Sequence, residues 1–311
     1  MTSAAIAPSR GLGRWWTYQR ERFPLVAHAP LIAAFSSAAV CLSSVLRGDR
    51  HPRAASLVVA FITALCFFFQ LRVADEFKDA EDDARHRPYR PVPRGLVTLR
   101  ELGWCGAAAA VVQLAAALWL DARLVPLLLL VWGYMALMSK EFFAREWLRA
   151  RPITVLWTHM LIMPLIDLYA TACDWIPARA TVAPGLRWFL VASFFNGIVV
   201  EIGRKIRASE MEEAGVETYS VLWGPARAAL VWVTVMAVAL ASAVLAARDV
   251  GSGRVVLFVL GAVFASAVLT SAAFAARATP GRAKWIEPLA GVWTLAMYLS
   301  VGVLPVFLRT R

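Results

Sequence analysis

The stretch Leu71–Gly95 reads LRVADEFKDAEDDARHRPYRPVPRG and joins a dense group of acids to the end of an apolar run, residues 54–71. Six acidic side chains fall within nine residues: Asp75, Glu76, Asp79, Glu81, Asp82 and Asp83. A carboxylate cluster beside a hydrophobic segment is costly unless a cation binds there. Divalent metal ions, together with the phosphate groups that they carry, meet this need.

The chain around this stretch has the composition of a membrane protein. Of its 311 residues, 60% are hydrophobic and 17% are charged, and the mean hydropathy is +0.62. Soluble domains are typically about 45–50% apolar and about 25% charged. Apolar runs long enough to cross a bilayer lie near residues 25–46, 54–72, 99–120, 124–140, 153–173, 185–201, 225–247, 254–277 and 286–308. We therefore predict an all-α polytopic membrane protein with about nine transmembrane helices in one bundle around a central cavity.

The net charge of +11 indicates membrane orientation rather than nucleic-acid binding, because the basic residues are spread over short loops. With nine spans, the amino terminus and the loops after the even-numbered spans share one side, which holds 22 of the 32 Lys and Arg residues. The positive-inside rule places that side in the cytoplasm. We expect an integral protein of the bacterial inner membrane, with its N-terminus in the cytoplasm and no nucleic-acid partner.

The chain divides into a short leading segment and a long helical domain. Residues 1–24 combine arginines with Trp15, Trp16 and Tyr18, which is typical of a segment at the membrane interface, here on the cytoplasmic side. Residues 25–311 form the transmembrane domain. Its two long charged loops, about 73–98 and about 202–224, follow the second and sixth spans, and loops of this length are usually functional. Their similar positions predict two pseudo-repeated halves, with both loops at the active site.

Helical spacing selects candidate metal ligands within the acidic cluster. Glu76, Asp79 and Asp83 share one face if the second helix continues through this stretch, and Asp75 lies beside that face. Mg²⁺ commonly binds through one or two carboxylates and substrate phosphates. The alternative is a solvated charged loop held by internal salt bridges. The flanking cations that can contact phosphate oxygens are Arg72, Lys78, Arg85, Arg87, Arg90 and Arg94, of which Arg72, Lys78 and Arg90 are the chosen candidates.

The other loops on the same side carry further candidates. Glu201, Arg204 and Lys205 share a helical face, which offers one carboxylate to a metal and two cations to a phosphate. Arg207 and Glu210 follow in the same loop. After the fourth span, Lys140 at the helix end is a candidate diphosphate ligand. The segment after it is expected to form an amphipathic surface helix held by i,i+4 pairs such as Glu141 and Arg145, with Glu146 and Arg149 on its surface.

The pattern Asp75-Glu76-x-x-Asp79-x-x-x-Asp83, followed by the RPVPRG run of 90–95, resembles the UbiA superfamily of intramembrane prenyltransferases. Nine helices, two polar loops and the segment 215–224 are also similar to that superfamily. The resemblance implies Mg²⁺-assisted binding of an isoprenoid diphosphate, with the lipid tail in a cavity that faces the bilayer. It implies a second acidic motif where this chain reads EIGRK, residues 201–205. Glu201 and Glu210 are left to supply its carboxylates, and the cations Arg204 and Lys205 take over part of the diphosphate binding.

The resemblance leaves the outcome of the reaction open. In one alternative, the allylic cation formed by carbon–oxygen cleavage is transferred to a small-molecule acceptor. In the other, a membrane terpene cyclase of the same superfamily converts a substrate such as farnesyl diphosphate to a cyclic terpene. A transporter is disfavoured, because transporters place ionisable groups near the bilayer midplane. The candidate cation-stabilising or polar side chains within the spans are Phe68, Tyr134, Trp157, Asp167, Phe195 and Asn196.

Overall fold

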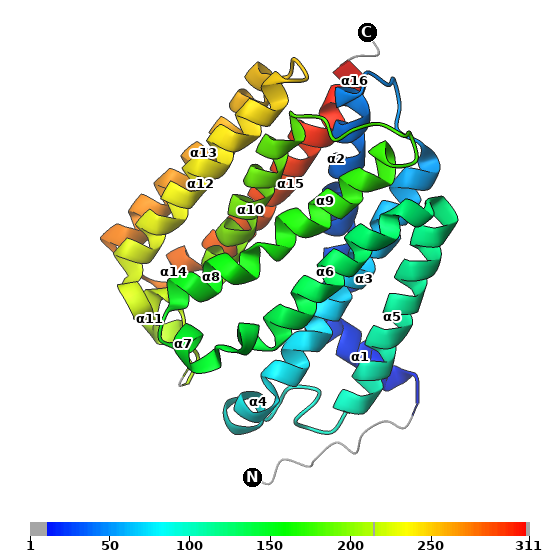
Figure 1. Cartoon of the computed structure of the whole chain (residues 1–311). Coiled ribbons are helices and arrows are strands. Elements are labelled where there is room, and N and C mark those ends of the chain that lie inside the picture. The colour runs from blue at the N-terminus through cyan, green and yellow to red at the C-terminus, as the bar shows by residue number, and fades with distance from the viewer. Residues whose placement is uncertain (1–10, 214, 309–311) are drawn as a thin grey trace.

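The computed structural model describes residues 11–213 and 215–308. Over these residues the chain is helical and contains nine helical segments long and apolar enough to cross a membrane, which confirms the predicted fold class (Figure 1). The spans are α2 (Leu25–Leu46), α3 (Ala54–Lys78), α5 (Leu99–Leu120), η1–α6 (Ala122–Leu124 and Val125–Ser139), α8–α9 (Pro152–Met160 and Ile162–Trp175), α10 (Leu186–Gly203), α12 (Pro225–Arg248), α13 (Gly253–Ala276) and a composite last span. The protein is thus an integral membrane protein.

Two spans depart from a regular α-helix next to a proline. Pro164 has no backbone N–H to donate to the carbonyl four residues earlier, so α8 ends at Met160 and α9 begins at Ile162. The last span comprises α14 (Pro280–Ala283), α15 (Ile286–Tyr298), the π-helical turn η4 (Leu299–Val303) and α16 (Leu304–Leu308). Pro305 lies just beyond the π turn, which is the kind of local adjustment that a missing helical hydrogen bond produces.

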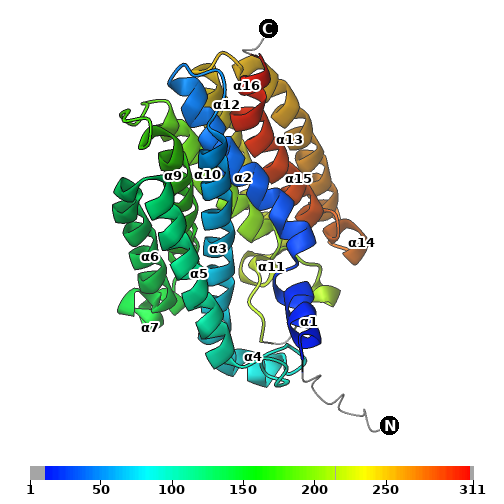
Figure 2. The same cartoon turned by 90° about the vertical axis from the view of Figure 1, so that its right-hand side faces the viewer.

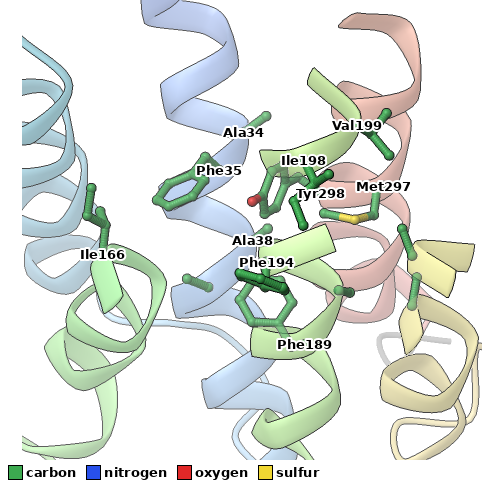
Figure 3. Packing of buried hydrophobic residues seen from close by; sticks show 14 of the residues in the cluster. Ala34, Phe35, Ala38, Ile166, Phe189, Phe194, Ile198, Val199, Met297 and Tyr298 are labelled. Atoms are coloured by element: carbon green, nitrogen blue, oxygen red, sulfur yellow. The ribbon is translucent and has the colours of Figure 1, made fainter. Parts of the chain in front are cut away.

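The core lies where α2, α9, α10 and α15 meet (Figure 3). The ring of Tyr298 packs edge-on against Phe35 and Phe189, with ring centroids 5.1 and 6.1 Å apart. Gly302 in η4 permits the closest approach, because a Cβ there would lie 2.4 Å from the backbone of Ala38. Small residues at such contacts let membrane helices pack by direct backbone approach.

Four short helices gather at one end of the bundle, and we call this end the loop end (Figures 1 and 2). They are α1 (Gly13–Arg22), α4 (Ala80–His86), α7 (Arg145–Arg149) and α11 (Tyr219–Trp223). The last helix, α16, lies at the opposite end. At that opposite end Arg47 holds the buried Asp174 with two contacts of 2.9 Å, which ties α2 to α9.

Helix α1 fastens the leading segment to the loop end. Tyr18 is buried against Val73 of α3 and Leu102 of α5. Arg22 forms an ion pair with Glu76 of α3, and Arg14 pairs with Glu101 of α5 at 2.5 Å. Because α1 reaches the acidic stretch directly, it helps to set which of those carboxylates face inward. Residues 1–10, which belong to the predicted interfacial segment, lie outside the described residues.

Candidate functional site

A polar cavity of about 580 Å³ opens at the loop end. Its walls come from three regions of the chain: the acidic stretch, the segment from the end of α6 into α8 (Pro152–Met160), and the loop that leads into α11. The lining residues are Lys78, Asp79, Asp82, His86, Glu141, Arg145, Arg149, Val155, Gly215, Val216, Glu217 and Val221. The two predicted active-site loops therefore do meet in space.

The acidic stretch does not form one continuous helix, as the spacing argument assumed. Helix α3 ends at Lys78, and Asp79 takes the non-helical angles φ −93° and ψ 4° before α4 begins at Ala80. Asp79 and Asp82 line the cavity, whereas Glu76 and Asp83 are buried and are not part of its lining. Of the three residues expected to share one metal-binding face, Asp79 lines the cavity and Glu76 and Asp83 do not, so their common role as ligands stays a prediction.

Both buried carboxylates are held by arginine. Glu76 pairs with Arg22, and its side chain is only 1% exposed. Asp83 pairs with Arg90, whose Nη1 lies 2.6 and 2.7 Å from the two carboxylate oxygens, and with Arg87 at 3.3 Å. Two residues predicted for opposite roles, Asp83 for metal and Arg90 for diphosphate, thus contact each other.

The carboxylate of Asp79 is the electrostatically strained member of the group. Burial raises the pKa of the Asp79 carboxyl above its ordinary value, and the negative charges of Asp75 and Asp83 add to this effect. Lys78 and Arg90 oppose it without cancelling it. A carboxylate that is crowded by other carboxylates and only partly compensated is a good ligand for an added cation.

Asp75 lies outside the buried set. Its side chain is 51% exposed and approaches Arg72 at 3.4 Å. Its charge also acts on Arg204 of the second loop. Burial works to lower the pKa of the Arg204 guanidinium, but the charges of Glu201 and Asp75 outweigh burial and the pKa is raised. The predicted first and second motifs are therefore in electrostatic contact.

Glu141 takes a position at the site that its sequence context did not predict. Glu141, Phe142 and Phe143 all adopt positive φ angles, between 48° and 57°, which non-glycine residues rarely combine in succession. This left-handed turn directs Glu141 to Lys78, with which it forms an ion pair, and to within 3.7 Å of His159 Nε2. The expected helical pair of Glu141 and Arg145 is wrong, because the turn interrupts the helix between them.

The segment after this turn contributes more residues to the polar cavity than the sequence predicted. Arg145 and Arg149 of α7 line the polar cavity, whereas Arg149 was predicted to lie on an ordinary surface helix. Lys140, the predicted diphosphate ligand at the end of α6, is exposed just before the turn. The sequence did contain a signal that charged residues here belong to the site, because Lys140 and Glu141 directly follow an apolar span.

In the second loop, Glu201 is held by both cations that share its helical face. Arg204 lies 2.5 Å and Lys205 2.9 Å from its carboxylate. Arg207 pairs with Glu213 at 3.2 Å. Glu210 is exposed in the short turn η3 (Ser209–Met211). As the sequence suggested, cations dominate at this motif.

Gly215 joins the second loop to α4. It has φ +78°, a conformation that glycine adopts without strain, and a Cβ at this position would lie 2.7 Å from the His86 ring. A side chain at this position would have to displace the His86 ring, so glycine lets the second loop approach α4 closely. Its contact with His86 forms part of the cavity wall.

The predicted aromatic and polar candidates within the spans divide into separate groups. Trp157 packs against Phe195 with ring centroids 5.9 Å apart, and the Tyr134 hydroxyl donates a hydrogen bond of 2.6 Å to the Thr158 carbonyl. Phe68 packs against Phe35 in the core. The two polar candidates are fully buried away from the polar cavity: Tyr298 donates to Asp167 at 3.3 Å, and Thr294 donates to Asn196 at 3.1 Å. Their roles stay predictions.

The donor set at the cavity suits Mg²⁺. Hard carboxylate oxygens are present at Asp79 and Asp82, in the same lining as Arg145 and Arg149, which suit phosphate. Over the described residues, no three His, Cys, Asp or Glu side chains already surround one point. Mg²⁺ commonly binds through one or two carboxylates together with substrate phosphates and water.

Comparison with known proteins identifies the fold. The chain matches the UbiA prenyltransferase family over residues 31–295. A search of curated proteins finds no match. A UbiA homologue from Aeropyrum pernix K1, in its apo form, superposes with a TM-score of 0.66 at 17% identity, covering 91% of this chain and 98% of the other. A UbiA homologue from Archaeoglobus fulgidus gives 0.56 at 14% identity, with 94% and 99% covered. Its complex with DMAPP and Mg²⁺ gives 0.51 at 13% identity, with 89% and 99% covered.

The likeness to solved structures concerns the fold, and the family match spans most of the chain. That match includes α3, the polar cavity and both charged loops. The nine spans and the acidic motif point the same way. This chain therefore belongs to the UbiA prenyltransferase family.

Proposed function

We propose that this protein ionises an isoprenoid diphosphate with the help of Mg²⁺ and transfers the prenyl group to an acceptor. The observation that carries the proposal is the polar cavity, where carboxylates for a metal and cations for a diphosphate line one space at the end of an apolar bundle. The Archaeoglobus fulgidus homologue has been solved with DMAPP and Mg²⁺ and with GPP and Mg²⁺, which supports the same class of substrate here.

Asp79 and Asp82, which line the polar cavity, are the proposed ligands of the metal, and Asp75 stays a predicted ligand. When bound, Mg²⁺ offsets negative charge on the departing diphosphate. In this assignment Glu76 and Asp83 hold the frame of the site through their arginine partners. The sequence also predicts Glu76, Asp83, Glu201 and Glu210 as metal ligands. Substitutions at these residues distinguish a structural role, which affects stability, from a ligand role, which affects Mg²⁺ binding.

The cations of the cavity bind and orient the diphosphate. Arg145 and Arg149 line the wall and offer planar guanidinium groups that suit phosphate oxygens. Lys78 shares the wall but is held by Glu141, so phosphate must compete with that carboxylate for the ammonium group. In the second loop, Arg204 and Lys205 are proposed to add positive charge where the family's second motif would have further carboxylates. Arg72, Lys140 and Arg207 stay predicted contributors.

The proposed reaction conserves atoms and electrons. The carbon–oxygen bond of the prenyl diphosphate breaks, and its electron pair leaves with the diphosphate. The resulting allylic cation accepts an electron pair from the acceptor, which then loses a proton. Apolar walls exclude the water that would otherwise capture the cation, and aromatic faces stabilise it. We further propose that the loop end, with α1, faces the cytoplasm, as the distribution of Lys and Arg indicates.

The alternative, a terpene cyclase, has one observation in its favour. Glu201 is occupied by Arg204 and Lys205, so the second motif departs from the family pattern in a way that can change the fate of the cation after ionisation. In a cyclase the cation is attacked by double bonds of the same substrate and no acceptor is used.

One experiment separates the two. Purified protein is incubated with Mg²⁺ and geranyl, farnesyl or geranylgeranyl diphosphate without an acceptor, and the organic extract is analysed. We expect no product until a nucleophile such as a phenolic acid is added. A cyclic hydrocarbon or terpene alcohol formed without acceptor would establish the cyclase. Asp79→Asn should abolish turnover, while Asp49→Asn, at the opposite end of the bundle, should not; an active Asp79→Asn enzyme would refute the metal site.

A further inference from the structure

Glu141 and His159 face each other at the wall of the polar cavity. Glu141 lines the cavity, and its Oε2 atom lies 3.7 Å from Nε2 of His159. The two side chains are 12% and 16% exposed, so bulk water has little access to the space between them. Neither residue serves as a metal or diphosphate ligand in the reaction proposed above, so the pair is free for another task.

The tautomer of the neutral His159 ring follows from its other nitrogen. Nδ1 lies 2.9 Å from the carbonyl oxygen of Val155, which can only accept a hydrogen bond, so Nδ1 carries the proton. Nε2 then presents a lone pair, and among the described residues it has no hydrogen-bond partner. A lone pair and a carboxylate that face each other leave a place for one proton, which either atom can hold.

The left-handed turn of residues 141–143 keeps this pair in place. Phe142, its middle residue, packs edge-on against Tyr134 of α6 and against His159 of α8, with ring centroids 5.6 and 6.1 Å apart. Backbone strain of this kind persists only where the surrounding structure fixes it, and it is common at functional sites. The turn therefore presents the Glu141 carboxylate to His159 and to the cavity at once.

Lys78 connects the pair to the binding of the diphosphate. Its ammonium group lines the same cavity and forms an ion pair with Oε1 of Glu141. A diphosphate that takes this ammonium for its own oxygens leaves the Glu141 carboxylate without its cation while the cavity holds substrate. The carboxylate then has the substrate on one side and the Nε2 lone pair on the other.

We infer that Glu141 accepts the proton that the prenyl-transfer reaction releases, and that His159 shares this proton through Nε2. The inference rests on the proposed function and deepens it. After the allylic cation has bonded to a ring carbon of the acceptor, the C–H bond at that carbon breaks. Its electron pair returns to the ring, and the proton goes to an oxygen of Glu141. Transfer of the proton to Nε2 gives an imidazolium beside a carboxylate, so neither charge is left buried without a partner.

Glu141→Gln separates proton transfer from binding, because the amide keeps the shape of the side chain but neither takes the proton nor holds the Lys78 ammonium. Calorimetry with Mg²⁺ and geranyl diphosphate should show about tenfold tighter binding, as expected when a competing charge-assisted contact is lost. Turnover of geranyl diphosphate with 4-hydroxybenzoate, a phenolic acid, should instead fall about 100-fold or more, as for the loss of a general base. Glu146→Gln removes an exposed carboxylate of the same segment that is not part of the cavity lining, and it should change neither quantity.

Deuteration of the phenolic ring identifies the step that has become slow. The wild-type protein should react equally fast with the normal and the deuterated acceptor, because a positioned base removes the proton quickly. In Glu141→Gln the deuterated acceptor should react more slowly, since breaking the C–H bond now limits the rate. His159→Asn keeps a donor for the Val155 carbonyl but removes Nε2. It should show the same isotope effect with a smaller loss of turnover and an unchanged affinity for geranyl diphosphate, which identifies His159 as a positioning residue.

Four results would overturn the inference. Wild-type turnover in Glu141→Gln would assign the proton to another group, with the diphosphate oxygens as the next candidate. A loss of turnover together with weaker binding, or without an isotope effect, would make the role of Glu141 structural. Unchanged affinity of Glu141→Gln for geranyl diphosphate would remove the link through Lys78. Absence of an isotope effect in His159→Asn would remove the sharing of the proton. Failure of the proposed function looks different, because the wild-type protein itself would then not bind geranyl diphosphate with Mg²⁺ or not transfer its prenyl group.

Discussion

Removal of the Arg22 guanidinium should destabilise the protein strongly, because it leaves Glu76 as an unpaired buried charge. The two side chains are 11% and 1% exposed, so water cannot replace the lost partner. Breaking a buried ion pair from one side costs about 3–5 kcal/mol, against about 0–1 kcal/mol for an exposed pair. We therefore expect Arg22→Ala to lower the free energy of unfolding by about 3–5 kcal/mol.

The double variant gives the diagnostic result. Glu76→Gln in the Arg22→Ala background removes the stranded charge, so it should recover part of the lost stability, and the two changes should be strongly non-additive. Equilibrium unfolding in detergent, at fixed lipid and ionic strength, measures each free energy. Arg14→Ala is the matched control on the same helix: its pair with Glu101 is more exposed, and its loss should have a much smaller effect.

The same variants decide whether Glu76 binds the metal. If Glu76 serves the frame, Glu76→Gln lowers stability while the dependence of activity on Mg²⁺ concentration stays close to that of the wild type. The reasoning is refuted if Arg22→Ala costs less than about 1 kcal/mol, the range of an exposed pair. It is also refuted if Glu76→Gln leaves stability intact and abolishes Mg²⁺ binding, as the sequence prediction of a metal ligand requires.

Three further predictions concern other parts of the structure. Since the folded-state pKa of Asp79 is raised, its ionised form destabilises the ligand-free protein as pH rises above about 4. Asp79→Asn should therefore raise the melting temperature near neutral pH. The same variant should abolish the stabilisation of the wild-type protein by Mg²⁺ and geranyl diphosphate, which amounts to about 2.7 kcal/mol at a ligand concentration of 100 times Kd. Gly215→Ala should weaken diphosphate binding, measured by calorimetry, because its Cβ would strike His86 and its φ is +78°; unaltered affinity would show that the loops need not close there. Asp174→Ala, which strands Arg47 at the opposite end, should lower the free energy of unfolding by about 3–5 kcal/mol without changing the Mg²⁺ concentration needed by the remaining folded enzyme.

The nine spans could be predicted from the sequence because crossing a bilayer depends on length and hydropathy, which are local properties. Helices α2 and α5 begin and end where the apolar runs predicted. Helix α3 runs six residues beyond its expected end at residue 72, since charged residues can continue a helix once it has left the hydrocarbon. The irregular turns near Pro164 and Pro305 could also have been predicted, because proline has no backbone N–H to donate to the helix.

The sequence by itself also determined the family and the stretch of carboxylates at which a metal is expected, because a motif is a matter of residue type and spacing. Only the tertiary structure decided which carboxylates face the polar cavity. Glu76 pairs with Arg22, which is 54 residues earlier in the sequence. Glu141 reaches Lys78 through a left-handed turn that the local sequence does not predict. A charge's partner is whatever the fold brings within a few ångströms, and neither periodicity nor composition contains that distance.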